Sequence, residues 1–450
     1  MSNKKPNTPK GTRDFGPAES AKRNHIISSI KAHFLNYGFS QIETPAMENL
    51  SVLMGKYGEE GDKLLFKILN SGDYLQKVSQ EDFEQGSQHV LPSIAEKGLR
   101  YDLTVPFARF VVQNRNDLAF PFRRFQIQPV WRADKPQKGR YREFYQCDAD
   151  IIGTKGVFSE VELTRLIQDV FKSLGYPNYL IKINHRELLF GLAQWCGLAT
   201  KEIQFCTALD KLDKIGHEKV TEELNNLGAD AEKLVQLFDL LGQDWNNMQK
   251  LEGIEALLPE NPGIETVKTY FRYLKDSGEN VSLDLSLARG LNYYTGIIFE
   301  VVAQDVKIGS ICGGGRYDDL TGVFGLPDVS GIGISFGLDR IYDVLEEKGL
   351  FPDSLKVSAQ ALITHFDEKS FVHGMDLLSE LRANQIPAML FPDLAKINKQ
   401  FNYANKIDIP YVIVIGEEEV KTRVYTVKQM KTGQQHSLAL SELIKLLKAE

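Results

Sequence analysis

Apolar and polar residues alternate along the stretch from Phe122 to Gly153, and this alternation constrains the fold more than any other feature of the chain. From Phe125 to Arg132 the alternation follows the period of two of a β-strand, which places Arg132 on the polar face. On the returning half, Gln146, Asp148 and Asp150 likewise share one face. The stretch therefore predicts a long hairpin whose polar face is the floor of a pocket, because a purely structural sheet would bury apolar side chains there.

The loop of this hairpin is basic, although the whole chain carries a formal net charge of -7. Between Pro121 and Arg142 there are seven Lys and Arg residues, at positions 123, 124, 132, 135, 138, 140 and 142, against one acid, Asp134. From composition alone, a charge run of this kind is more often solvated surface than a site. However, an arginine fork matches two phosphate or carboxylate oxygens at once, and a loop rich in Lys and Gly can wrap the remaining charge. The loop is therefore a candidate anion site.

The chain has 450 residues, which is too long for one ordinary core and predicts about three domains. Its first part is predicted to contain a helix over Ala21–Tyr37 that stops at Gly38, a strand over Phe39–Pro45, and strand-like sequence from Leu99 to Gly153. Helical periodicity then runs from 186 to 277 and interrupts the strand-rich part, so we expect an inserted helical module. Strand signal resumes at Val281 and continues through LDLSLARGLNYYTGIIFEVV, a glycine-rich turn, and a final strand that passes into a helix.

After Pro352, strands and helices alternate at short spacing, which predicts an α/β unit with a mixed sheet. We expect strands over 357–366, 386–392 and 411–416, a hairpin after them, and helices over 370–384, 394–407 and 441–450. From Lys356 onward there are twelve Lys and Arg residues against eleven Asp and Glu, a balance of +1, so the rest of the chain carries -8. The sign of this mild contrast favours contact between the C-terminal unit and nucleic acid.

The first residues, MSNKKPNTPKGTRDFGP, are basic and polar without an apolar centre, so no secretory signal is predicted. No later apolar run is long enough to cross a bilayer, and we expect a cytoplasmic protein without a membrane partner. No metal-ligating residues are predicted, and His185 is interpreted as structural because no carboxylate or metal spacing accompanies it. Neither a zinc site nor a disulfide framework is indicated, since no C-x-x-C pair is formed by Cys147, Cys196, Cys206 and Cys312.

Three further segments combine arginine with glycine or tyrosine. Arg289 stands beside a glycine in an apolar stretch, where it is either an edge-strand residue or the partner of an anion. The run Gly313–Gly315 before Arg316 and Tyr317 lets the backbone approach a ligand closely, although a tight turn explains it as well. Arg340 follows a glycine-spaced strand that matches neither the dinucleotide-binding nor the P-loop pattern. In the first turn of a helix, Arg340 also opposes the macrodipole, which makes a structural role less attractive.

Together these segments resemble, in order and content, the histidyl-tRNA synthetase family of class II aminoacyl-tRNA synthetases. Phe39–Pro45 is similar to motif 1 of that class, Phe122–Gly153 to motif 2, and Gly331–Arg340 to motif 3. The segments LARGLNYYTG and GGGRYDDL are similar to two signatures particular to the histidine enzymes, and KGTRDFGP near the N-terminus matches as well. The resemblance spans nearly the whole chain.

The resemblance implies an α+β fold with a class II antiparallel sheet, flanking helices, a helical insertion and a C-terminal α/β anticodon-binding domain. The catalytic domain would comprise 1–185 and 278–350, the insertion 186–277, and the anticodon-binding domain 355–450. A homodimer is implied, since motif 1 builds the subunit interface in this class. The insertion would clamp the acceptor stem of the tRNA.

The implied reaction is the ATP-dependent attachment of L-histidine to its cognate tRNA through a histidyl-adenylate, with release of pyrophosphate and AMP. By resemblance, catalysis is assigned to Arg132 and Arg289 on either side of the α-phosphate. ATP, with Mg²⁺ bridging its outer phosphates, would be bound by Arg132, Arg140, Arg289 and Arg340. Histidine would be bound by Asp102, Thr104 and Gln146 at the ammonium group, and by Asp150, Tyr293, Tyr294 and Tyr317 around the ring. Such a polar pocket would make editing unnecessary.

Two positions depart from patterns common in the family. Asp102 stands where many bacterial members carry glutamate, as in the variant common in eukaryotic members, and Asn292 replaces an aspartate. One alternative function is that of a non-catalytic paralogue that activates ATP phosphoribosyltransferase, but such proteins generally lack the anticodon-binding domain and have degraded arginine motifs. A synthetase for proline, threonine or glycine is a second alternative, against which ARGLNYYTG counts.

Overall fold

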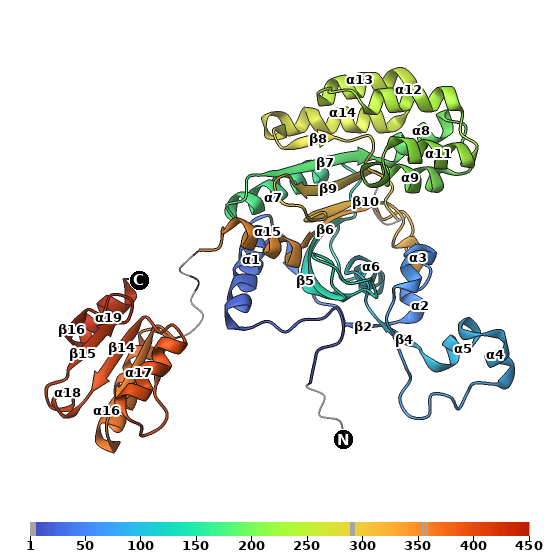
Figure 1. Ribbon diagram of the computed structural model, residues 1–450. Coiled ribbons are helices and arrows are strands. Elements are labelled where there is room, and N and C mark those ends of the chain that lie inside the picture. Colours follow the sequence, from blue (N-terminus) through green and yellow to red (C-terminus); the bar gives the residue numbers. More distant parts are fainter. Residues whose placement is uncertain (1–5, 289–292, 353–354, 356–358, 450) are drawn as a thin grey trace. The chain divides into compact units, whose positions relative to one another are not determined.

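The computed structural model describes residues 6–288, 293–352, 355 and 359–449 (Figure 1). Contacts divide the chain into two compact units, the first formed by residues 1–14 and 23–351 and the second by 15–22 and 352–450. Arg289 and Asn292, which were singled out from the sequence, lie outside the described residues. No helix among the described residues is both long and apolar enough to span a bilayer.

The first unit is built on an eight-stranded sheet with the order β1-β5-β6-β11-β10-β9-β7-β8. Its strands are β1 (Ser40–Gln41), β5 (Phe122–Trp131), β6 (Glu143–Ile152), β7 (Tyr179–His185), β8 (Val281–Leu283), β9 (Ile297–Ala303), β10 (Cys312–Tyr317) and β11 (Gly331–Gly337). Only the outermost pairs, β1 with β5 and β7 with β8, are parallel. The predicted hairpin is confirmed as β5 and β6, and the last strand passes into a helix as expected.

Three helices cover the apolar face of this sheet (Figure 1): α1 (Pro17–Asn36), α7 (Phe158–Ser173) and α15 (Leu338–Lys348). The ring of Phe34 in α1 lies 5.3 Å from Phe125 and 6.1 Å from Phe336, between centroids. Phe171 in α7 packs 5.9 Å from the same Phe336 ring. Because the period of two sends the other side chains of β5 and β11 to the opposite face, that face is left for polar groups.

Helix α1 ends as its sequence predicts. Gly38 has φ +76°, a left-handed conformation that glycine adopts without a steric penalty. The N–H of Phe39 donates to the carbonyl oxygen of Phe34 over 3.0 Å, which closes the helix end.

Two expectations for the N-terminal part were wrong. The strand predicted over Phe39–Pro45 is only the two-residue β1, and the strand-like region from Leu99 contains the helix α6 (Thr104–Gln113). Its residues TVPFARFVVQ are rich in β-branched and aromatic types, which favour strands locally. Tertiary burial decides otherwise, because Phe107, Ala108 and Val111 are buried along one helix face.

The segment before α6 forms a three-stranded antiparallel sheet and short helices. These elements are β2 (Met47–Asn49), β3 (Lys67–Ile68), β4 (Lys97–Leu99), α2 (Leu50–Leu53), α3 (Gly58–Lys63), α4 (Gln80–Gln85) and α5 (Ser87–Ile94).

Seven helices follow β7 and precede β8, within the region expected to be helical. They are α8 (Arg186–Trp195), α9 (Glu202–Leu209), α10 (Leu212–Ile215), α11 (His217–Leu227), α12 (Ala231–Leu241), α13 (Asn247–Leu257) and α14 (Pro262–Leu274). A 3-10 turn over Lys275–Gly278 leads into β8. The strand signal from Val281 onward was only partly right, because β8 ends at Leu283 and β9 begins at Ile297.

The second unit has a five-stranded mixed sheet with the order β13-β12-β14-β15-β16. Its strands are β12 (Ala361–His365), β13 (Ala388–Leu390), β14 (Tyr411–Ile415), β15 (Val424–Gln429) and β16 (Gln435–Ala439). Its helices are α16 (Glu368–Ala383), α17 (Ile397–Lys406), α18 (Glu417–Thr422) and α19 (Leu440–Lys448). The mixed sheet is confirmed, with β12 parallel to its two neighbours and the β15–β16 hairpin antiparallel. Helix α18 was not predicted.

Candidate active site

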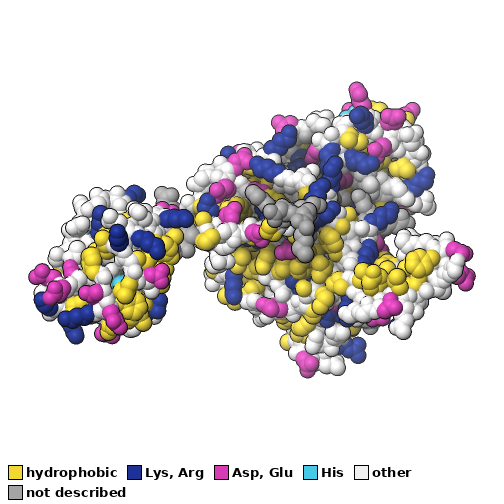
Figure 2. Space-filling view, turned by 60° about the horizontal axis from the view of Figure 1, so that its bottom comes forward, with side chains coloured by type: hydrophobic (Ala, Val, Ile, Leu, Met, Phe, Trp, Pro, Cys, Tyr) yellow, Lys and Arg dark blue, Asp and Glu magenta, His cyan; other side chains and the backbone are white. Residues whose placement is uncertain are grey.

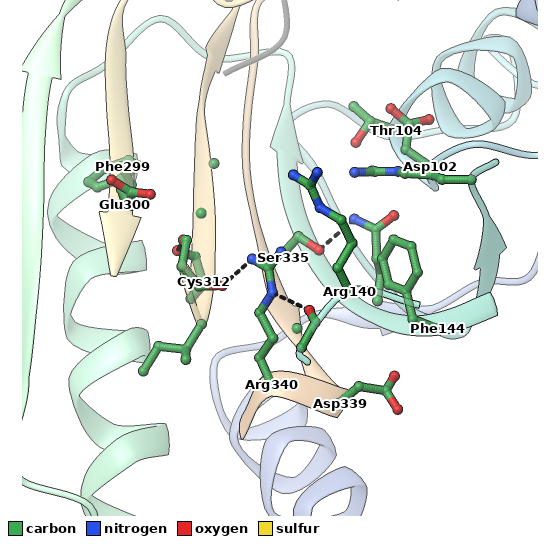
Figure 3. A pocket seen from close by; sticks show the side chains of 18 of the residues that line it. Asp102, Thr104, Arg140, Phe144, Phe299, Glu300, Cys312, Ser335, Asp339 and Arg340 are labelled. Carbon is green, nitrogen blue, oxygen red and sulfur yellow. Dashed lines mark hydrogen bonds between the residues drawn. The ribbon is translucent and has the colours of Figure 1, made fainter. Parts of the chain in front are cut away.

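A cavity of about 320 Å³ opens on the polar face of the eight-stranded sheet (Figure 3). It is lined by parts of the loop between β5 and β6, the start of α6, strands β9 to β11 and the start of α15. The residues predicted from the sequence that line it are Asp102, Thr104, Arg132, Arg140, Gln146, Tyr293, Tyr294 and Arg340. Segments distant in the sequence therefore meet at one place.

The register of the sheet explains the polar face beneath this cavity, of which Gln146 and Ser335 line the cavity itself. In the hairpin, Arg124 pairs with Asp150, and Gln128 with Gln146. Across the next strand, Asp148 pairs with Ser335. Since paired residues point to the same face, these polar groups form a continuous patch, and the shared face predicted for Gln146, Asp148 and Asp150 is confirmed.

Glycines in β10 and β11 leave space for larger side chains at and beneath the floor of the cavity. The run Gly313–Gly315 lies inside strand β10 and not in a turn, so the turn interpretation was wrong. A Cβ on Gly315 would lie 2.9 Å from the Tyr294 ring, and a Cβ on Gly333 in β11 would overlap the Asp150 carboxylate. The absence of side chains at these positions leaves room for Tyr294 and Asp150.

The Arg132 side chain is held through its Nε atom and through the faces of its guanidinium, and not through its Nη groups. Its Nε donates to the carbonyl oxygen of Tyr101 over 3.0 Å, and its guanidinium carbon lies 4.1 Å from the Tyr101 ring centroid and 5.2 Å from that of Phe144. Among the described residues, its two Nη groups make no hydrogen bond, although the charge of Arg132 acts on the nearby Asp102. The fork is thus oriented in advance with two donor groups left for an anion.

The basic loop is a tight hairpin in its own right. Gln137 and Arg140 exchange backbone hydrogen bonds of 3.0 and 2.9 Å around Gly139. Arg340 ties this loop to the β9–β10 turn, because its Nε donates to Gly139 O over 2.8 Å and its Nη1 to Ser310 O over 2.6 Å (Figure 3). Arg140 itself is half exposed, 3.6 Å from Asp134. The loop is therefore anchored near its tip while one arginine, Arg140, remains available at the cavity.

Another part of the cavity wall is acidic. Asp102 is buried, and its carboxylate accepts hydrogen bonds from Val105 N (3.1 Å), Tyr57 Oη (3.0 Å) and Tyr293 Oη (3.4 Å). Burial raises the pKa of Asp102 despite these donors. An acid of this kind favours a cationic group placed beside it.

Asp150 and Tyr317, both predicted to contact histidine, lie beneath the floor and do not line the cavity. Tyr317 Oη donates to Asp150 Oδ1 over 2.7 Å, and Arg124 lies 2.7 Å from Asp150 Oδ2. Their assignment to the histidine ring stays a prediction. Burial raises the pKa of Asp148, with a further contribution from Asp150, although Arg124 opposes this.

Sequence reasoning missed Arg124 and Ser335 as components of the site, and it placed Asp148 on the polar face without giving it a role. Arg124 was counted in the basic run, yet it precedes Gln126 and Gln128 by two and four residues and so shares their polar face. That parity could have identified it. Ser335 could not have been identified in this way, because its pairing with Asp148 depends on a register between distant strands.

The N-terminal segment supports the loop from outside. Gly11 O accepts a hydrogen bond of 2.8 Å from Arg142 N, and Arg13 lies over the Tyr141 ring, 3.3 Å from its centroid. Arg13 and Arg23 both pair with the buried Asp339, the residue before Arg340. Gly11 and Arg13 of the KGTRDFGP segment therefore contact the basic loop and the start of α15.

His185 has the structural place expected for it. It caps α8, with Nδ1 accepting a hydrogen bond of 3.2 Å from Glu187 N. Burial, together with the nearby Arg316, lowers its pKa to about 4.

A family model described as histidyl-tRNA synthetase matches residues 73–341, and one described as anticodon binding domain matches residues 360–450. The chain belongs to the histidyl-tRNA synthetase family. The resemblance stated from the motifs is thereby confirmed.

Members of this family match the chain over nearly its whole length. The histidine–tRNA ligase of Cytophaga hutchinsonii is 49% identical over 447 residues, which cover 98% of this chain and 99% of the relative. That of Christiangramia forsetii is 51% identical over 453 residues, with 99% of each chain covered. The crystal structure of histidyl-tRNA synthetase from a Nostoc species is 28% identical, with a TM-score of 0.82 over 98% of this chain and 99% of that one. The α+β class II fold predicted for the histidyl-tRNA synthetase family is therefore confirmed.

Proposed function

We propose that this chain uses ATP to attach L-histidine to its cognate tRNA through a histidyl-adenylate, releasing pyrophosphate and AMP. The observation that carries the proposal is the bipolar cavity, in which Arg132, Arg140 and Arg340 face the same space as the buried carboxylate of Asp102. An amino acid fits such a cavity with its ammonium group at the acidic end and its carboxylate toward the arginines.

The first chemical step brings the histidine carboxylate, an anion, to the α-phosphate of ATP, another anion. The two Nη groups of Arg132 would bridge the carboxylate and the α-phosphate. The rings of Tyr101 and Phe144 hold the Arg132 guanidinium in place, so that both Nη groups are oriented before the substrates bind. Arg140 and Arg340 would hold the outer phosphates, and Arg340 would also flank the adenine. Donors fixed before the reaction stabilise developing charge without reorganisation, which is the main physical source of rate.

Arg289 is assigned to the α-phosphate from the side opposite Arg132. It lies outside the described residues, so this role rests on its place in the LARGLNYYTG signature.

Selection of histidine is assigned to the acidic end of the cavity. Asp102, Thr104 and Gln146 would bind the ammonium group, while Tyr293, Tyr294, Asp150 and Tyr317 would surround or support the ring. A competitor with an apolar side chain would leave these buried polar groups unpaired, a penalty worth roughly 10⁴-fold in selectivity.

Mg²⁺ is proposed to accompany ATP. Among the described residues no group of three or more His, Cys, Asp or Glu side chains is placed to hold a metal ion, and Mg²⁺ commonly binds through phosphates and water with one or two carboxylates. Glu300, which lines the cavity, fits as such a carboxylate. When bound, the ion would neutralise charge on the outer phosphates.

The tRNA would bind along both units. A second cavity, of about 810 Å³, adjoins the first and is lined by Arg186 and Lys214 of the helical region and by Lys138 and Arg140 of the loop. These cations support entry of the acceptor end there, with 186–277 clamping the acceptor stem and 355–450 binding the anticodon.

A homodimer in the cytoplasm is also proposed. Exposed apolar side chains gather on the segment 69–94, which contains α4 and α5 (Figure 2). They include Leu69 and Phe83, and they suit an interface between two copies of the chain.

Histidine-dependent exchange of labelled pyrophosphate into ATP tests the proposed function. Exchange with histidine alone is the expected result. No exchange with any amino acid would instead support the regulatory paralogue, and exchange with proline, threonine or glycine would select another synthetase. The variant Arg289→Ala should fold and bind histidine but lose exchange, and near-normal exchange would contradict its role.

A further inference from the structure

Residues Lys10–Arg13, which we call the N-terminal strap, lie against both limbs of the basic loop. On the returning limb, Arg142 donates from its backbone N–H to Gly11 O over 2.8 Å and from Nη1 to Lys10 O over 3.4 Å. Gly11 has φ +88°, and a Cβ on it would lie 2.8 Å from Arg142 Cγ and 2.9 Å from Pro136 Cγ on the outgoing limb. The strap can therefore approach the loop this closely because position 11 is a glycine.

Arg13 joins the loop to the start of α15. Its guanidinium carbon lies 3.3 Å from the Tyr141 ring centroid, and its Nη2 group forms an ion pair with Asp339. The Asp339 carboxylate is only 5% exposed, and it also accepts from Arg23 Nη1 over 2.5 Å and from Tyr145 N over 3.0 Å. A buried carboxylate with these donors is held in one orientation, so Arg13 has a fixed partner there.

Two contacts hold the loop on either side of Arg140. Before it, Gly139 O accepts from Arg340 Nε over 2.8 Å. After it, the Tyr141 ring lies against Arg13. The Arg140 side chain is half exposed and lines the cavity, so its reach depends on where its two neighbours are held. Arg13 is not among the described residues that line the cavity, and its effect on a bound substrate has to pass through the loop.

We propose that Arg13 is a positioning residue that fixes the basic loop before ATP binds, so that Arg140 is presented to the outer phosphates. This inference rests on the proposed function, which places those phosphates at Arg140. A loop that is already ordered loses less conformational entropy when the ligand binds, so the ligand binds more tightly. Donors that are fixed in advance also need no reorganisation during the reaction.

Arginine suits this position better than lysine does. A planar guanidinium can stack its face on Tyr141 and donate in its own plane to the Asp339 carboxylate. A lysine ammonium is a compact charge on a flexible stem, and it cannot keep both geometries at once. Arg13→Lys should therefore behave more like Arg13→Ala than like the wild-type protein.

The test measures the KM for ATP in histidine-dependent pyrophosphate exchange with the full-length protein. Arg13→Ala should raise this KM roughly tenfold, while the Kd for L-histidine, measured by calorimetry, stays unchanged. Lys10→Ala is the matched control, because it removes one exposed positive charge from the same strap but keeps the backbone carbonyl that contacts Arg142. Its KM for ATP should equal that of the wild-type protein.

Limited trypsin digestion provides a readout that needs no substrate. The Lys138 side chain is 66% exposed, and cleavage after it requires the loop to open locally. Cleavage there should be several times faster in Arg13→Ala than in the wild-type protein or in Lys10→Ala. Saturating ATP should reduce this difference, because the bound phosphates hold the same loop.

Gly11→Ala provides a second, independent arm that changes no charge. Its Cβ would crowd Arg142 and Pro136, and the positive φ is unfavourable for alanine. The variant should raise the KM for ATP and speed cleavage after Lys138, as Arg13→Ala does. The double variant should show less than the sum of the two effects, because both changes release the same loop.

An unchanged KM for ATP in Arg13→Ala, or equal losses of affinity for ATP and for histidine, would overturn the positioning role. An equal rise in KM for Lys10→Ala would also overturn it, because loss of charge alone would then explain the effect. If the wild-type protein supports no histidine-dependent exchange, the proposed function fails instead. In that case the digestion still decides whether the strap holds the loop.

Discussion

Arg124 lies 2.7 Å from Asp150, between Nη2 and Oδ2, and neither side chain is more than 3% exposed. The same guanidinium is 4.0 Å from Asp148 and lies over the Phe107 ring, 4.2 Å from its centroid. One buried cation thus serves two buried carboxylates under the cavity. Removing it would leave uncompensated negative charge in a region of low dielectric constant.

Arg124→Met should therefore destabilise the protein by about 3–5 kcal/mol, because it keeps the side-chain bulk but removes the cation from the buried pair. The midpoint of urea unfolding measures the change. Adding Asp150→Asn should recover part of the loss.

The neighbouring Arg123 is the matched control for this substitution. It pairs with Glu162 at 2.7 Å, but both side chains are 33% exposed. Arg123→Met should change the free energy of unfolding by no more than about 1 kcal/mol, as for other surface pairs. Similar effects at 123 and 124 would refute the assignment of Arg124 as a buried counter-charge.

Arg132→Lys should lower the rate of histidine-dependent pyrophosphate exchange roughly a hundredfold, because a lysine cannot present two parallel donors to two oxygens. Circular dichroism should be unchanged. Lys135→Ala removes a charge from the same loop, but Lys135 is exposed and does not line the cavity, so it should retain most of the rate. A rate for Arg132→Lys close to wild type would argue against a bridging role.

Gly333→Ala should destabilise the sheet by about 1–3 kcal/mol, since its Cβ would overlap the Asp150 carboxylate and force the strands apart. Gly337→Ala is the control, because the nearest atom to its Cβ is 3.7 Å away. Thermal unfolding of the two variants gives the comparison. Equal midpoints would mean that the floor adapts without strain.

His185 should make stability depend on pH on the acid side. Its pKa falls from 6.5 to about 4 in the folded chain, mainly through burial. Between these values the unfolded chain binds a proton that the folded chain does not, so stability should rise with pH across this window by roughly 3 kcal/mol.

His185→Asn should flatten this dependence, because asparagine can still cap the helix but does not titrate. Thermal midpoints from pH 4 to 7 provide the measurement, with His89→Asn, an exposed position, as the control. An unchanged acid slope in His185→Asn would show that the titration belongs to another group.

Much of the site could be predicted from local pattern. Period two placed Gln146 and Asp150 on one face before any pairing was known, and the sheet register bears this out. The helix α6 was not predicted, since Val105 and Phe107 favour strands in isolation and become helical through burial. The glycine run at 313–315 was taken for a turn because its flexibility is visible in the sequence and its strand partners are not.

The sequence alone determined which side chains of the hairpin share a face, where helix α1 stops, and which motifs mark the family, because these depend on neighbours a few residues apart. The tertiary structure decided which faces meet. The contact of Ser335 with Asp148, the ion pair of Arg124 with Asp150, and the meeting of Arg132 with Arg340 at one cavity all join strands or loops brought together by folding. Their geometry follows from strand order and register, which are set by the packing of the whole sheet and not by any local stretch.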